Sequence, residues 1–464
     1  MRAMTSLHRV VFVSAALASF AMAAVACSDD DDRKTFETGG VDSGTDARQP
    51  TPPAEAGPVE SGTDAGNDFD AADEPVVCDV EPCAVDIAAG QNHFCVLMSD
   101  KTARCWGDDS LGQLGAGMPA PDPEPDAGPV RVVQGLTNVT QISAGGTTTC
   151  GRLVDGTVEC WGGNDVGQLG LTADPPTSDW NPHPTAAAVA VSGALRVDVG
   201  VHSACAIVTS GDVLCWGAND QAQLARSVEA TIGGPAKIDA LSGKTVQTGA
   251  GTNTSFAVHQ DGTISSWGAT TGTSGTIAGR LASVSPDLLP GALLLDGVTS
   301  FAVSPWRVDS PWPAPDRGLA HACAVAEGRL YCWGDSMLGA MGFGVPFAFV
   351  RPTLVPIQGE ARPQRAAVSM EISCVRMSDG TVQCAGDDSH GQLGRGADAG
   401  LFSDFFTPAK AFDGHALRVA VSDETVCVVV RGGKVMCWGG NAYGELALGS
   451  IDDSPHPTPT LVQF

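Results

Sequence analysis

A paired-cysteine pattern recurs along the chain and constrains its fold more than any other feature. The segment HSACAIVTSGDVLCWG, from His202 to Gly217, has two cysteines ten positions apart, with Trp-Gly directly after the second. Similar segments begin at His93 and Thr148. In one copy Ala385 takes the place of the tryptophan, and the other copies have Trp106, Trp161, Trp216, Trp267, Trp333 and Trp438. Seven units, 51 to 66 residues apart, predict a repeat architecture.

Each unit contains short segments with strand-like alternation, separated by Gly, Asp and Asn. In the second unit these segments are PVRVV (129–133), VTQISAG (139–145) and the two segments that carry the cysteines. We take the proline-led segment as the first strand of its unit and the segment ending in Trp-Gly as the fourth. Four strands at a period of about 50 residues are typical of a propeller blade. The predicted fold class is therefore all-β.

These units resemble the regulator-of-chromosome-condensation repeat. The resemblance rests on an A-G-x-x-H-x-C segment, on C-W-G and on G-Q-L-G, which ends at Gly170 in the second unit. It extends from about Asp86 to the C-terminus, although the unit with Trp267 lacks both cysteines and G-Q-L-G. Because members of this family form seven-bladed β-propellers, the resemblance implies such a propeller over residues 78–464.

The cysteine spacing predicts disulfides within each hairpin. A three-residue turn with Gly at its left-handed third position places the two cysteines opposite each other, within disulfide reach. In the unit without cysteines, Phe256 and Ser266 replace both together, as expected of partners. Zinc is the alternative, but hairpin pairs supply no third and fourth ligand, so we expect no metal and no cofactor. The expected pairs are Cys78 with Cys83, Cys95 with Cys105, Cys150 with Cys160, Cys205 with Cys215, Cys323 with Cys332, Cys374 with Cys384 and Cys427 with Cys437.

The N-terminus predicts export. Arg2 and Arg9 precede an apolar run that ends at Ala26, directly before Cys27. This arrangement resembles a bacterial lipoprotein signal, with residues 1–26 removed and Cys27 lipidated. Lipidation also explains the odd total of 15 cysteines. The alternatives are ordinary signal cleavage at the same bond and, less favoured, a retained membrane helix.

Residues 27–77 are rich in Asp, Gly, Ala, Pro and Thr, which predicts a disordered acidic tether rather than a calcium loop. The expected location is the bacterial cell envelope, outside the cytoplasm. The protein would be held there by its lipid to a membrane, the outer membrane more readily than the inner. The net charge of −27 argues against nucleic-acid binding.

Candidate functional residues lie in the long loops rather than in the repeated motif. One tryptophan per unit at a fixed strand position predicts core packing, and His93 and His321 predict structural hydrogen bonds. No catalytic motif is present in the sequence, so we do not expect an enzyme. The long loops emerge on one predicted face, where aromatic residues either contact a partner or fold back over the blades. The partner-binding candidates are Trp180, Trp306, Arg307, Trp312, Phe402, Phe405 and Phe406.

The sequence thus predicts a lipid-anchored propeller that binds a protein partner through its long-loop face. The alternatives are a carbohydrate-binding lectin or an enzyme that uses the central channel, and a purely structural envelope protein. We further expect the C-terminal segment Thr460–Phe464 to close the ring. It would complete the first unit beside the strand around Ile87, because that unit lacks a clear proline-led strand.

Overall fold

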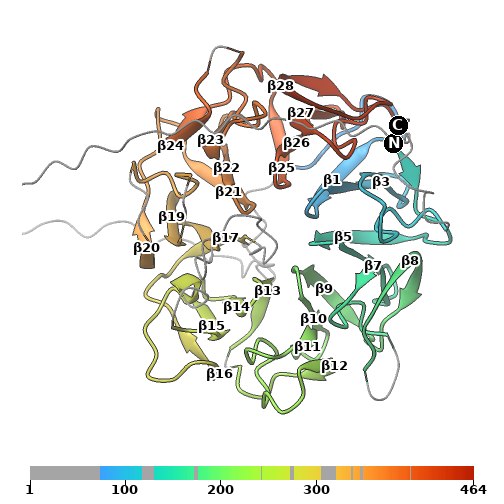
Figure 1. The fold of residues 1–464 in the computed structure, drawn as a ribbon, viewed down its shortest axis with the longest axis vertical. Helices are drawn as coiled ribbons and strands as arrows, with labels where there is room; N and C mark the ends of the chain where they lie inside the picture. Colours follow the sequence, from blue (N-terminus) through green and yellow to red (C-terminus); the bar gives the residue numbers. More distant parts are fainter. Residues whose placement is uncertain are drawn as a thin grey trace, which may run out of the picture. The chain divides into compact units, whose positions relative to one another are not determined.

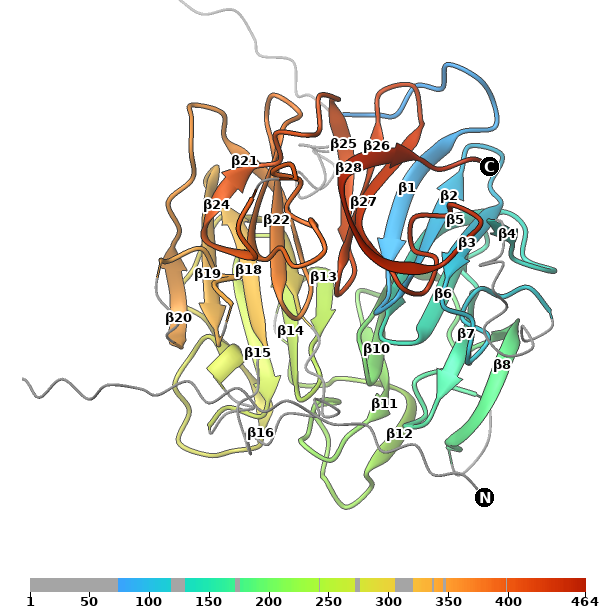
Figure 2. The ribbon, with the colours of Figure 1, turned by 45° about the horizontal axis from the view of Figure 1, so that its top comes forward.

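The structure is a computed structural model that describes residues 74–117, 130–171, 176–241, 243–271, 276–304, 320–335, 338–344, 348–397 and 399–464. Seven four-stranded antiparallel sheets stand around a central axis, seen face on in Figure 1 and tilted in Figure 2. The prediction of an all-β, seven-bladed propeller is confirmed. Within these ranges no helix has the length and apolar character needed to cross a bilayer.

Each blade is one sheet of four consecutive strands, with the first strand at the channel and the fourth at the outer edge (Figure 1). A short 3-10 helix, η1 (Thr276–Ala278), lies between two strands of blade 4. The strands of blades 1 to 3 are β1 (Ala84–Ala89), β2 (His93–Met98), β3 (Ala103–Gly107), β4 (Arg131–Val132), β5 (Val139–Gly145), β6 (Thr148–Leu153), β7 (Val158–Asn164), β8 (Asp179–Ala188), β9 (Ala194–Val199), β10 (Ser203–Val208), β11 (Val213–Ala218) and β12 (Ile232–Lys237). Those of blades 4 to 7 are β13 (Thr245–Ala250), β14 (Thr254–His259), β15 (Ile264–Gly268), β16 (Asp287–Ala292), β17 (Val298–Val303), β18 (His321–Ala326), β19 (Arg329–Gly334), β20 (Phe349–Leu354), β21 (Pro363–Val368), β22 (Ile372–Met377), β23 (Val382–Asp387), β24 (Phe402–Pro408), β25 (Ala416–Val421), β26 (Thr425–Val430), β27 (Val435–Asn441) and β28 (Asp452–Leu461).

The strand order corrects one prediction. The proline-led segment around Arg131 is not the first strand of the second unit, because β4 pairs with β3 and ends blade 1. The glycine-rich loop after Trp-Gly reverses the chain, and the next strand returns beside the strand it has just left. Six of the seven outer strands contain proline, as in β8 with Pro182 and Pro184. An outer edge tolerates proline because no neighbouring strand needs the missing N–H.

The Trp-Gly tryptophans hold neighbouring blades together. All six are fully buried, and each indole donates to a backbone carbonyl of the preceding blade. Trp216 Nε1, for example, lies 2.9 Å from the Gln168 carbonyl oxygen. Gly170, two residues further on, has a φ of +62° and abuts the same indole, so no other side chain fits there. These contacts agree with the predicted role of the tryptophans in the core.

The cysteines pair as the spacing predicts. Cys205 and Cys215, for example, face each other on β10 and β11 with their Cα atoms 4.1 Å apart. Blade 4 has Phe256 directly opposite Ser266 at the same place. The seven disulfides join Cys78 to Cys83, Cys95 to Cys105, Cys150 to Cys160, Cys205 to Cys215, Cys323 to Cys332, Cys374 to Cys384 and Cys427 to Cys437.

The first hairpin turn departs from the others in sequence but not in conformation. Lys101 there takes the left-handed conformation, with a φ of 65°, that glycine takes in the other ten-residue copies. The strands on either side keep their register, since Cys95 still lies directly opposite Cys105. The pairing of the cysteines therefore depends on the length of the turn and not on glycine itself.

Ring closure differs from the prediction. Thr460 and Leu461 pair with Cys437 and Met436 of β27, so β28 completes blade 7 and not blade 1. The seam between blades 7 and 1 is closed by contacts other than a shared sheet. Trp106 Nε1 donates to the Glu445 carbonyl oxygen at 2.7 Å, and the Phe464 ring lies 6.0 Å from that of Trp106. The shift by one strand described above explains the error, because β4 already completes blade 1 and β28 is the fourth strand of blade 7.

Candidate functional site

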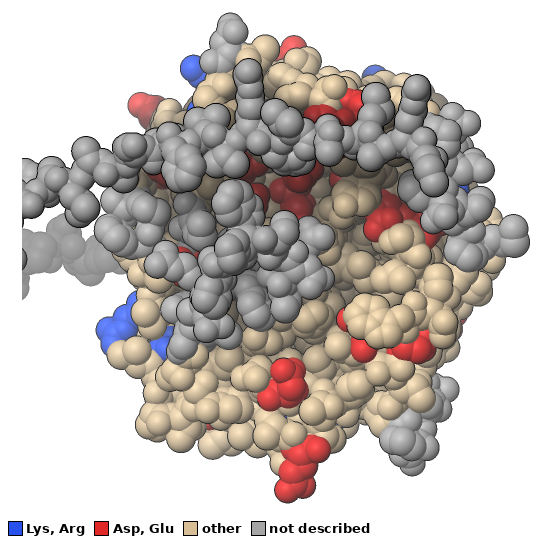
Figure 3. Space-filling view, viewed as in Figure 1, with Lys and Arg blue, Asp and Glu red and all other residues tan. Residues whose placement is uncertain are grey.

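The connections between first and second strands and between third and fourth strands emerge on one face of the ring, which we call the loop face. Figure 3 shows this face. Asp and Glu side chains are spread over it, and the Lys and Arg side chains that can be seen lie near its margin. Its acidic groups include Asp108, Asp165 and Asp220, which follow Trp-Gly in successive blades. The field of this face favours cationic or neutral partners over polyanions.

The aromatic candidates in the described residues lie on outer strands and do not form one cluster. Trp180, 79% exposed, is on β8 of blade 2, whereas Phe402 and Phe405, 51% and 52% exposed, are on β24 of blade 6. The prediction for Phe406 is wrong, because its side chain is 1% exposed. It packs against Gly342 and belongs to the same core cluster as Ala385. Phe406 thus fills the space that a tryptophan fills in other blades.

An exposed apolar surface spans the junction of blades 5 and 6. Leu401, Phe402 and Phe405 form this surface, which we call the blade 5–6 patch, and Leu401 is 70% exposed. The blade 5 loop runs along it, because Gly344 abuts the Phe405 ring and its N–H donates to the Asp404 carbonyl at 2.8 Å. Trp306, Arg307 and Trp312 lie outside the described residues, in the connection between β17 and β18 of blade 5. Cys27 and the predicted signal peptide also lie outside them.

The two motif histidines make structural contacts between blades. His93 Nε2 lies 2.8 Å from Thr149 Oγ1, and His321 Nε2 lies 2.7 Å from Ser373 Oγ. Complete burial lowers the pKa of His93 to about 4, so its ring stays neutral at physiological pH. Among the described residues no three His, Cys, Asp or Glu side chains are grouped so that they could hold a metal ion.

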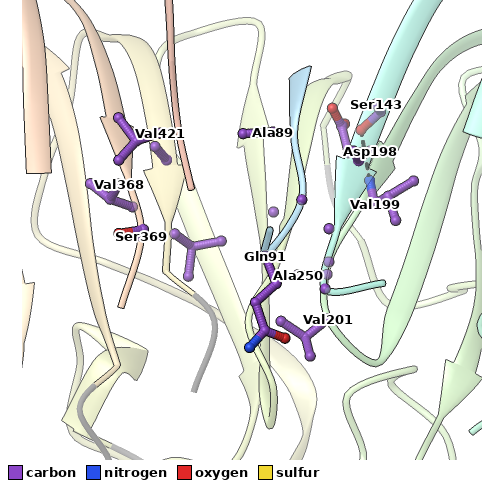
Figure 4. A pocket seen from close by; sticks show the side chains of 18 of the residues that line it. Ala89, Gln91, Ser143, Asp198, Val199, Val201, Ala250, Val368, Ser369 and Val421 are labelled. Carbon is purple, nitrogen blue, oxygen red and sulfur yellow. Dashed lines mark hydrogen bonds between the residues drawn. The ribbon is translucent and has the colours of Figure 1, made fainter. Parts of the chain in front are cut away.

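The central channel has a narrow part towards the loop face. Its volume is about 200 Å³, and the ends of the inner strands line it, mostly with small or apolar residues. Figure 4 shows Ala89, Val368 and Val421 on this wall, with Ser143 and Asp198 on the neighbouring strands β5 and β9. The Val199 N–H donates to Ser143 Oγ at 3.0 Å, which joins blades 2 and 3.

The channel widens towards the opposite face, where the cysteine hairpins turn, which we call the hairpin face. This wide part has a volume of about 960 Å³ and is lined by the inner strands of all seven blades. It shares Ser143, Asp198 and Gln247 with the narrow part, so the two form one channel. Its lining includes five cationic side chains: Arg152, Arg196, Lys244, Arg365 and Arg418. Sequence reasoning missed these residues, because they are spread over five blades and follow no motif.

The fold and the repeated contacts define the class of protein: a seven-bladed propeller whose blades are joined by one Trp-Gly tryptophan each, with Phe406 replacing it in blade 6. Residues 84–113, 139–168 and 418–445 match the family model described as the Regulator of chromosome condensation (RCC1) repeat. These three segments of the chain therefore carry RCC1-type repeats.

The similar proteins match this chain over different shares of their own length. The human "Probable E3 ubiquitin-protein ligase HERC6" is 28% identical over 187 residues, which are 40% of this chain and 18% of that protein. The chain thus matches less than a fifth of HERC6. The "Ultraviolet-B receptor UVR8" of Arabidopsis thaliana is 25% identical over 380 residues, 80% of each chain. The crystal structure of Prp20p from Saccharomyces cerevisiae superposes with a TM-score of 0.66 at 17% identity, covering 86% of this chain and 89% of Prp20p.

Proposed function

We propose that this protein is an exported binding module that contacts a protein partner through the loop face at blades 5 and 6. The observation that carries the proposal is the blade 5–6 patch, because exposed aromatic side chains grouped on one surface are typical of protein interfaces. The connection with Trp306, Arg307 and Trp312 belongs to the same blade 5, and its composition is that of interface hot spots.

The family supports binding as the general role. Prp20p has binding properties to Gsp1p and histones, and a second structure has Kap60 bound to the same yeast protein. At 17% to 18% identity those partners are not carried over to this chain. Its acidic loop face instead suits a partner with a basic or neutral surface.

We expect a photo-reactive amino acid at position 402 to crosslink the native protein to its partner in intact cells. The same residue at position 289 is the matched control, because Leu289 is also exposed but lies on the outer strand of blade 4. Mass spectrometry then identifies the crosslinked protein. Replacing Trp306, Arg307 and Trp312 with alanine should abolish that product.

The melting temperature of the triple alanine variant should stay within about 2 °C of the parent, since the substitutions lie in a connection between strands. A large fall in melting temperature would instead mean that these side chains cap the blades. Equal crosslinking from positions 402 and 289 would remove the patch from the proposal.

We further propose that the mature chain begins at a lipidated Cys27 in the envelope. Seven disulfides suit an oxidising compartment, and Cys27 is the one cysteine without a partner among the predicted pairs. Mass spectrometry of protein from the native membrane should show an N-terminal diacylglyceryl cysteine. A mature N-terminus with an unmodified Cys27 thiol would favour ordinary signal cleavage.

A further inference from the structure

The wide part of the central channel is basic in a strongly acidic protein. Its described lining contains five cationic side chains and two carboxylates, Asp86 and Asp198, while the whole chain has a net charge of −27. Arg196, Arg365 and Arg418 lie on inner strands, whereas Arg152 lies on β6 and Lys244 directly precedes β13. Such a concentration of one charge sign in a cavity focuses the electrostatic field within it.

The two carboxylates are already engaged with protein groups. Asp198 accepts hydrogen bonds from Arg196 Nε at 2.8 Å and from the Thr248 N–H at 2.9 Å. Asp86 lies 3.8 Å from Arg418 Nε, across the seam between blades 1 and 7. The two carboxylates therefore offset Arg196 and Arg418, while Arg152 and Lys244 have no carboxylate partner among the described residues, which leaves an excess of positive charge.

Arg152 lies close to a second cationic side chain of the channel, Arg196. The buried Nε of Arg152 has no hydrogen-bond partner among the residues that the structure describes. Burial and the nearby Arg196 both lower the pKa of Arg152, because a second positive charge disfavours the protonated form. A guanidinium that lies beside another cation and has an N–H without an acceptor can bind an anion.

We propose that the wide part of the channel binds a small oxyanion with two or more negative charges, of the phosphate or polycarboxylate class. The cavity volume suits a small molecule, and arginines from several blades can each donate two hydrogen bonds to one anionic group. This site is distinct from the proposed partner surface, which lies on the loop face.

The surroundings of the mouth favour a small anion over a nucleic acid. Hairpin turns on this face carry Asp100, Asp155, Asp261 and Asp379. Hydrogen bonds from the threonine two residues later lower the pKa of each, so these four stay ionised. An extended polyanion would meet this acidic ring, whereas a small anion can pass inside it.

Calorimetric titration of the full-length protein at low ionic strength tests the site, with citrate and inorganic phosphate as separate probes. We expect one anion per molecule, and the tighter probe shows whether carboxylate or phosphate is preferred. Arg365→Gln and Lys244→Gln should each weaken binding by about tenfold, the effect of one lost charge-assisted hydrogen bond. Lys244 is exposed on a connection, so its variant is not expected to affect folding.

Arg351→Gln is the matched control, because Arg351 is exposed on the outer strand β20 and its loss changes the net charge equally. Its affinity for both probes should equal that of the parent. The proposal is wrong if neither anion binds, or if Arg351→Gln weakens binding as much as Lys244→Gln. Competition by a single-stranded oligonucleotide at the same variants would also overturn it in favour of a polyanion site.

Discussion

Deletion of residues 457–464 should lower the free energy of unfolding by about 4 kcal/mol or more. Loss of the buried Val462 side chain alone costs about 2 kcal/mol. The lost backbone hydrogen bonds to β27 and the lost contact of Phe464 with Trp106 add about 1 kcal/mol each. The change would also expose the edge of β27, which is a site for aggregation.

Urea denaturation of the truncated and parent proteins measures this loss, with Phe464→Ala as the milder comparison at about 1 kcal/mol. Hydrogen exchange locates it. Because β28 belongs to blade 7, backbone amides of β27 should lose protection first, while those of β1 keep theirs. Early loss of protection in β1 would mean that the C-terminal segment completes blade 1 after all. An unchanged denaturation midpoint would show that the segment contributes nothing to closure.

The repeated motif was enough to predict the number of blades and the disulfides. Cysteines on opposite strands of a hairpin are local in sequence, so turn length alone places Cys205 opposite Cys215. The buried tryptophans follow from the same logic, because an identical position in every blade must face an identical environment. The disulfides could be predicted because they depend on contacts within one repeat, and the buried tryptophans because the same contact with the preceding blade recurs from blade to blade.

The boundary of the repeat was not predicted correctly, for a physical reason. A periodic sequence has no intrinsic start, and a proline-led strand fits either edge of a blade because both the inner and the outer strand have a free side. Strand pairing resolves the ambiguity. Because β4 pairs with β3 and β28 pairs with β27, each proline-led strand is the outer strand of the blade that precedes it, and the described strands form seven complete blades.

Candidate sites were harder to predict because they depend on contacts between blades. The sequence did not distinguish Phe406 from its exposed neighbours Phe402 and Phe405, because a loop was expected there. The segment is a strand, in which successive side chains face opposite sides. The burial of Phe406 depends on Ala385, which leaves room for a large ring. The channel cations come from five blades, so only the closed ring shows that they face one cavity.

Glu445 is an exception to the repeat that sequence comparison between blades does reveal. Four other blades have glutamine at this position: Gln113, Gln168, Gln223 and Gln392. In each, the side-chain oxygen accepts from a backbone N–H and the amide nitrogen donates to an aspartate, as Gln392 does to Asp387 at 2.6 Å. Glu445 keeps the first bond, from the Tyr443 N–H at 2.8 Å, but its buried Oε1 has no partner.

Burial raises the pKa of Glu445 to about 7, with further contributions from the negative charges of Glu424 and Asp108. The folded protein therefore holds a proton that the unfolded chain, with a pKa near 4.5, releases. Below pH 4.5 both states are protonated and the group has no effect on stability. Between pH 4.5 and 7 stability falls as pH rises, and above pH 7 the full cost of about 3 kcal/mol is present.

Glu445→Gln should therefore stabilise the protein by about 3 kcal/mol at pH 8 and by little at pH 4.5. The amide keeps the bond from Tyr443 and carries no charge, so the repulsion by Glu424 and Asp108 is removed. Urea denaturation of both proteins across this pH range measures the difference in their free energies of unfolding. The titration of groups that the two proteins share cancels in this difference. Glu360→Gln, which removes an exposed charge in the loop before β21, should show no such trend. A gain for Glu445→Gln that is the same at every pH would contradict the raised pKa, because a permanently neutral or permanently charged carboxyl group gives no pH dependence.

Since Trp106 donates to the backbone carbonyl of Glu445, the same variant should also slow hydrogen exchange at the seam between blades 7 and 1 at pH 8.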